Sequence, residues 1–166
     1  MDISPFENIK IEVEKLAEKI QAPKYLLPIY GVSLDDRPCV DINSDGQFSL
    51  IYSERGKVNI SDLALDINHL LYLVFRNVTY SMALEYVLLN HDQNIDDRRL
   101  LFQKQLELLG KIDTEWQKRE HANQEQILRQ YPLNDYAGKK QAYLRELLGN
   151  GFLYNEALEK ANQQYP

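Results

Sequence analysis

The sequence predicts an α+β fold in which a small antiparallel β-meander packs against a helix-rich layer. Closely spaced turn signals within residues 26–60 indicate a run of short antiparallel strands. Apolar residues at helical spacing precede this segment in residues 7–21 and follow it in residues 61–166. The chain has 166 residues, which fits a single domain over 1–166 with a core of its own.

The N-terminal helix and the meander have separate signals. Residues 7–21 carry one apolar stripe, and Ala22-Pro23 ends the helix because proline disfavours a helical conformation in the residue before it. Turn signals at 35–38, 44–46 and 54–57 then separate the strands. The expected strands are Leu27–Val32, Cys39–Ile42 and Gln47–Ser53, with brief pairing at Val58–Ile60.

The remaining residues, 61–166, read as helices. Ser61 is the expected N-cap of a long helix that continues to about Leu89. A third helix is expected over Ile95–Glu120 and a short fourth one over Gln124–Gln130. Two amphipathic helices, Tyr136–Leu148 and Leu153–Gln163, follow on either side of a Gly-Asn-Gly turn.

Composition narrows the class of protein. The one cysteine, Cys39, offers no internal disulfide and no cysteine-rich zinc site. The N-terminus has no basic start and no apolar region typical of a signal peptide. The longest apolar run, Leu70–Phe75, is far too short to span a membrane. We therefore expect a cytoplasmic protein.

The negative charge is concentrated near the N-terminus. The formal net charge is −6, of which residues 1–66 contribute −5 and residues 67–166 contribute −1. Because no basic face is evident, we expect no nucleic-acid partner. The acidic turn residues predict contact with a basic protein instead, and the alternative is that the charge only keeps the protein soluble. The predicted contact residues are Asp35, Asp36, Asp41 and Asp45.

No catalytic, metal or cofactor motif stands out. His69, His91 and His121 are widely spaced and match no zinc-binding pattern. The glycines form no phosphate-binding loop, and no serine lies in a nucleophile elbow. We expect no cofactor, no metal and no enzymatic activity.

Two polar motifs are less ordinary, Glu54-Arg55-Gly56 and Asp96-Asp97-Arg98-Arg99. Adjacent residues on a helix lie about 100° apart, so the two arginines face different ways. We expect one of them to bind a carboxylate such as Glu54 or Glu85 and so tie the helix to the sheet. The alternative is that the arginines bind an anionic substrate, but no catalytic base or nucleophile accompanies them in the sequence.

The order of these features resembles the bacterial polymorphic-toxin immunity proteins, most closely the immunity protein 63 family. The resemblance runs from about Ile9 to Asp135 and leaves the last 30 or so residues unmatched. The features that carry it are Ala22-Pro23, Ser53-Glu54-Arg55-Gly56, Leu70–Phe75, Asp96-Asp97-Arg98-Arg99-x-x-Phe102, Trp116 and Tyr131-Pro132.

The resemblance implies a cytosolic antidote that binds the toxic C-terminal domain of a protein encoded by a neighbouring gene. Such toxins are often nucleases. It also implies that the motif residues Glu54, Arg55, Gly56, Asp96, Arg98 and Arg99 maintain the fold. Two other functions stay open: a non-catalytic scaffold or adaptor for another protein, and an enzyme that acts on an anionic substrate through Arg55, Arg98, Arg99 and Glu54.

Overall fold

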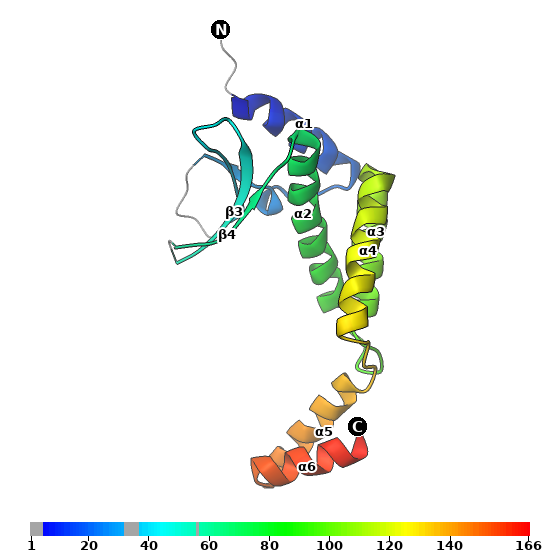
Figure 1. The fold of residues 1–166 in the computed structure, drawn as a ribbon. Helices are drawn as coiled ribbons and strands as arrows, with labels where there is room; N and C mark the ends of the chain where they lie inside the picture. Colours follow the sequence, from blue (N-terminus) through cyan, green and yellow to red (C-terminus); the bar gives the residue numbers. More distant parts are fainter. Residues whose placement is uncertain (1–4, 32–36, 56) are drawn as a thin grey trace. The chain divides into compact units, whose positions relative to one another are not determined.

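The structure is a computed structural model that describes residues 5–31, 37–55 and 57–166. These residues form a four-stranded sheet and a set of helices (Figure 1). The predicted α+β class is confirmed. Helix α1 spans Pro5–Lys19 and is followed by the short 3₁₀ helix η1, Lys24–Leu26. The strands are β1 (Ile29–Tyr30), β2 (Cys39–Ile42), β3 (Phe48–Glu54) and β4 (Lys57–Leu63). The later helices are α2 (Ile67–Asn90), α3 (Arg98–Ile112), α4 (Thr114–Gln130), α5 (Ala137–Gly149) and α6 (Tyr154–Gln164).

The chain divides into two compact units. The first consists of Met1–Met82 and Gln105–Glu120, and the second of Ala83–Lys104 and His121–Pro166. The single domain expected over 1–166 stays a prediction. None of the described helices is both long enough and apolar enough to cross a membrane.

The sheet has the strand order β1-β2-β3-β4. Strands β2, β3 and β4 pair antiparallel, which confirms the predicted meander for these strands. Strand β1 differs, because it pairs parallel to β2 with Ile29 opposite Cys39. The connection from Tyr30 to Cys39 is longer than a two-residue hairpin loop, so hairpin geometry does not impose antiparallel pairing on these two strands.

The predicted helix start at Ser61 is wrong, because Ser61 lies within β4. The ladder with β3 continues to Leu63, and the Ala64 N–H then donates to the Phe48 carbonyl at 2.8 Å. Helix α2 begins at Ile67, where the Asp66 carboxylate accepts the His69 N–H at 2.7 Å as an N-cap. Inter-strand pairing therefore overrides the local capping signal of Ser61.

The helix expected over Ile95–Glu120 is also two helices in the structure. Asp113 separates them, because its carboxylate accepts the N–H groups of Glu115 at 2.7 Å and Trp116 at 3.1 Å. This is the geometry of an N-cap, so a new helix begins at Thr114. Helix α4 then continues to Gln130 and absorbs the separate helix expected over Gln124–Gln130.

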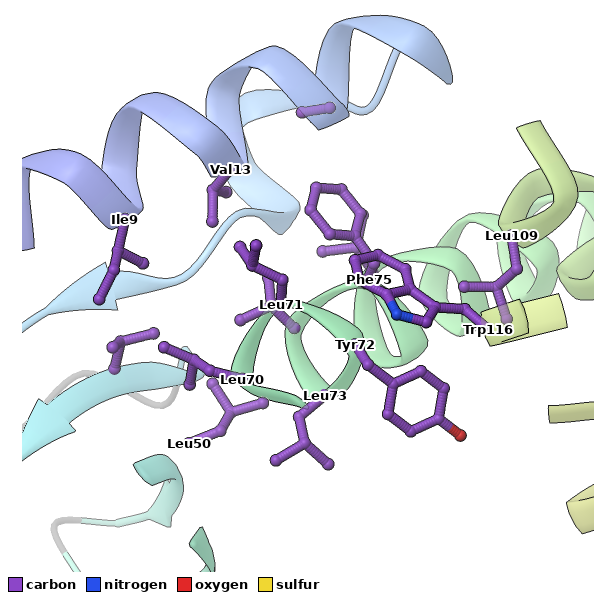
Figure 2. Packing of buried hydrophobic residues seen from close by; sticks show 14 of the residues in the cluster. Ile9, Val13, Leu50, Leu70, Leu71, Tyr72, Leu73, Phe75, Leu109 and Trp116 are labelled. Carbon is purple, nitrogen blue, oxygen red and sulfur yellow. The ribbon is translucent and has the colours of Figure 1, made fainter. Parts of the chain in front are cut away.

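The core of the first unit surrounds the N-terminal half of α2 (Figure 2). Ile9 and Val13 of α1 and Leu50 of β3 pack onto the run Leu70–Phe75, which is buried on all sides. A helix that is apolar all round is buried all round, which explains this run. The indole of Trp116 stacks on Phe75 with ring centroids 6.2 Å apart and meets Tyr72 edge-on at 6.2 Å.

The second unit has a smaller core. Ala83, Val87 and Leu101 are buried together in one cluster. The two C-terminal helices were predicted to within a residue or two, and the turn between them contains Gly151 with a φ of +89°. Ala157 and Ala161 of α6 are fully buried, since small residues let the two helices approach closely.

Candidate functional site

The predicted acidic surface is partly described. Asp35 and Asp36 lie outside the described residues. Asp45 is exposed in the β2–β3 turn, where the Asn43 side-chain oxygen accepts the Asp45 N–H at 3.0 Å and the Gln47 N–H at 2.9 Å. The backbone of this turn also closes through the Gly46 N–H, which donates to the Asn43 carbonyl at 3.0 Å. Asp45 is therefore presented on an ordered turn.

Asp41 lies on the outer face of the sheet. Residues directly opposite one another point to the same face of a sheet, and successive residues along a strand point to opposite faces. Val40 and Leu50 are opposite each other and fully buried, so their face is the core face. Asp41 and Ser49, one position along, are also opposite each other and point to the other face. The structure thus brings Asp41 and Asp45 to one hairpin.

Within the Glu54-Arg55-Gly56 motif, Glu54 ends β3 and Arg55 follows it, before β4 begins at Lys57. Arg55 has a φ of +53°, in the left-handed region that is uncommon for residues other than glycine. Glu54 is opposite Lys57 in the ladder, and a β-bulge lies between Tyr52 and Ser53. Gly56 and the side chain of Glu54 lie outside what the structure describes, so the motif is placed only by the backbone of Glu54 and Arg55.

Arg98 binds several oxygen atoms at the start of α3. Its guanidinium donates to Asp96 through Nε at 3.0 Å and Nη2 at 2.6 Å, and to the carbonyls of Tyr131 and Pro132 at 2.8 and 2.9 Å. Arg98 therefore binds a carboxylate, as expected, but that carboxylate is Asp96 and not Glu85, and the side chain of Glu54 lies outside what the structure describes. Asp96 is closer in sequence, and the backbone of Tyr131 and Pro132 supplies acceptors that no sequence pattern reveals.

Arg99 makes a second ion pair in the same network. Its Nε and Nη2 atoms donate to the two carboxylate oxygens of Asp135 at 2.8 and 2.7 Å. The Asp96 N–H donates to the same Asp135 at 2.9 Å, and the Asn134 N–H donates to Asp96 at 2.9 Å. The Arg98 and Arg99 side chains lower the pKa of Asp96 and of Asp135, respectively, to about 2. The network joins the start of α3 to residues 131–135.

A buried carboxylate, Glu120, was missed by the sequence analysis. Its side chain is 5% exposed, accepts the Tyr72 hydroxyl at 2.8 Å, and lies 3.1 Å from Arg76 Nε. Burial, and then the bond to Glu120, raises the pKa of Tyr72 to about 12. Tyr72 and Arg76 are four residues apart on α2, so this spacing is the signal that could have indicated a shared polar partner.

Further polar contacts involve Tyr72 and Trp116. The Arg119 guanidinium lies 4.1 Å from the centroid of the Tyr72 ring, and its Nη2 atom is 3.1 Å from His69 Nε2. The Trp116 indole N–H donates to Asn68 at 3.2 Å. No polar atom among the buried described side chains is left without a hydrogen-bond partner. The cluster is thus internally satisfied, as a structural network requires.

The three histidines each contact a different partner. His91 Nδ1 is 2.8 Å from Asp97, and His121 Nδ1 is 3.9 Å from Glu125. The Leu65 N–H donates to His69 Nδ1 at 3.1 Å. Within the described ranges, no three histidine, cysteine or acidic side chains are grouped so that they could hold a metal ion.

The described part of the first unit contains a half-open groove of about 540 Å³ beside α1, η1 and β1. Its walls include Glu7, Glu14, Lys10 and Lys24, so their charges cancel. Burial and the nearby Glu14 raise the pKa of Tyr30 in this groove. A groove without net charge favours neither an acidic nor a basic ligand.

Comparison with protein-family models gives a match. The model of the family described as immunity protein 63 matches residues 44–126, which is half of the chain. No curated protein and no solved structure matches the chain. The matched segment contains β3, β4, α2 and α3, the Glu54-Arg55-Gly56 and Asp96-Asp97-Arg98-Arg99 motifs and Glu120. The chain therefore belongs to the immunity protein 63 family.

Proposed function

We propose that this protein neutralises a bacterial toxin by binding its toxic C-terminal domain, which is encoded by a neighbouring gene. The observation that carries the proposal is the family match, since membership of an immunity protein family implies a toxin partner. The two proteins would then form a polymorphic toxin system used in bacterial competition. The immunity protein would act in the cytoplasm, and we expect the toxin to be a nuclease.

Inhibition by surface complementarity needs no catalytic residue, so we propose that the protein is not an enzyme. The ion pairs of Arg98 with Asp96 and of Arg99 with Asp135 support a structural role for this motif. A substrate anion at either arginine would have to displace a carboxylate that already binds in two-pronged geometry. We likewise propose the acidic residues Asp35, Asp36, Asp41 and Asp45 as part of the toxin-binding surface.

Co-expression tests the proposal. The toxic domain is produced in bacteria alone, with this chain, or with an unrelated acidic protein of similar size. We expect growth to be restored only by this chain and the two proteins to purify as a complex. Continued killing and the absence of a complex, with both proteins folded, would contradict the proposed function.

A further inference from the structure

Three large apolar side chains are exposed where β4 leads into α2. Leu63, Leu65 and Ile67 are 51%, 86% and 51% exposed, and all three lie in the segment that matches the family. Isolated exposed apolar residues are ordinary on protein surfaces, whereas several close together mark interaction sites. We call these three residues the apolar anchor.

The backbone under the apolar anchor is held by hydrogen bonds on both sides. The Ala64 N–H donates to the Phe48 carbonyl at 2.8 Å, and the Leu65 N–H donates to His69 Nδ1 at 3.1 Å. The Asp66 carboxylate caps α2 through the His69 N–H at 2.7 Å. Leu65 is therefore presented on an ordered connection, so less conformational entropy is lost when a partner covers it.

The apolar anchor adjoins the acidic hairpin. Leu63 is opposite Ser49, which is itself opposite Asp41, so these three residues form one row across the outer face of the sheet. The Ala64 bond to Phe48 places the end of β4 at the same end of the sheet as the turn that carries Asp45. An apolar centre with carboxylates on its hairpin side complements a basic surface with an apolar socket on that side.

We propose that Leu63, Leu65 and Ile67 insert into a basic surface of the toxin while Asp41 and Asp45 contact the basic side chains around them. This inference rests on the proposed function and adds to it the anchor and the charge of the partner surface. Leu65 is the central residue because it is the most exposed of the three and lies between the other two.

The test measures binding of the full chain to the toxic domain encoded beside it, made inactive by mutation, with isothermal titration calorimetry. We expect Leu65→Ala to weaken Kd about tenfold or more. Leu65→Lys should weaken it further, because a new positive charge would face a basic surface. Leu89→Ala is the matched control, since Leu89 is also 86% exposed but lies in the second unit, and its Kd should stay within about twofold of wild type.

The outcomes separate the two proposals. If the wild-type chain binds the toxic domain and Leu65→Ala binds equally well, the apolar anchor is wrong and the proposed function stands. If Leu65→Lys binds more tightly than Leu65→Ala, the basic partner surface is wrong. If the wild-type chain does not bind at all, the proposed function fails. An unchanged fluorescence spectrum of Trp116, the one tryptophan, verifies that each variant is folded.

Discussion

A few residues provide the hydrogen-bond partners of the buried polar groups in the first unit. Glu120 lies in the core, and Tyr72 and Arg76 both bind it. Removing one partner of a buried hydrogen bond strands the other, whereas removing both leaves no stranded group. Replacing one partner should therefore lower the free energy of unfolding more than replacing both partners of the same hydrogen bond.

We predict that Glu120→Leu lowers the free energy of unfolding by about 1–3 kcal/mol, because the Tyr72 hydroxyl loses the Glu120 carboxylate and Arg76 loses its ion pair with it. Adding Tyr72→Phe should recover part of that loss. The measurement is urea unfolding followed by Trp116 fluorescence, which reports on this cluster. Glu115→Leu is the control, because Glu115 is 75% exposed on the same helix. Additive effects of Glu120→Leu and Tyr72→Phe would rule out the proposed coupling.

Gly138 is a position where the structure leaves no room for a side chain. A Cβ atom at this position would lie 2.8 Å from the backbone carbonyl oxygen of Gln93, and backbone atoms cannot move aside as a flexible side chain can. We predict that Gly138→Ala destabilises α5 by about 1–3 kcal/mol, measured as faster hydrogen exchange of its amides. Gly149→Ala, in the same helix with open space around it, should leave exchange unchanged. Equal exchange in both variants would contradict the close approach.

At the scale of elements, a network of two arginines and two aspartates joins the start of α3 to residues 131–135. The pKa values of Asp96 and Asp135 are lowered to about 2, below the ordinary 3.8. A lowered pKa contributes stability that is fully present above the unfolded-state value and is lost as the pH falls through the folded-state value. The network should therefore hold at neutral pH and weaken between about pH 4 and pH 2.

We predict that hydrogen-exchange protection at the start of α3 falls across this pH window. The double variant Asp96→Asn/Asp135→Asn lacks the two titrating groups, so its protection should be lower at neutral pH and should change less on acidification. Other carboxylates titrate equally in both proteins, and the difference between the two pH profiles isolates this network. Parallel profiles would show that these two aspartates do not carry the effect.

Elements whose signal is local were predicted well from the sequence. Helices α5 and α6 were placed to within two residues because each has its own apolar stripe and a glycine turn lies between them. Ser61 and Asp113 show the two ways in which such reasoning fails. Ser61 looks like an N-cap, but pairing with β3 keeps it in a strand, and Asp113 is an N-cap inside what reads as one continuous helical pattern.

Site contacts were harder to predict, because their partners are distant in sequence. Arg99 binds Asp135, which is 36 residues further along the chain, and Tyr72 binds Glu120, which is 48 residues further along. No spacing rule within one helix connects such pairs. The sequence indicated that one of the two arginines, Arg98 or Arg99, binds a carboxylate, and only the fold determines which carboxylates are within reach of each.

At the scale of the whole molecule, charge is the property that bears on recognition. The net charge of −6 comes almost entirely from residues 1–66, which belong to the first unit. Charge on a protein attracts an oppositely charged partner before contact and so raises the association rate, and salt screens this attraction. The position of the charged residues and the total net charge should therefore contribute separately to the association rate.

We predict that Asp41→Lys/Asp45→Lys slows association with the toxic domain about threefold or more at low salt and makes the rate less dependent on salt. The control is Glu156→Lys/Glu159→Lys in α6, since either double variant shifts the net charge from −6 to −2 but only the first alters the proposed surface. Stopped-flow measurements over a range of salt concentrations distinguish the two. If both variants slow association equally, total charge alone steers the encounter, and if neither does, Asp41 and Asp45 lie away from the approach of the toxin. A slower rate confined to Asp41→Lys/Asp45→Lys would locate the encounter on the acidic hairpin next to the apolar anchor.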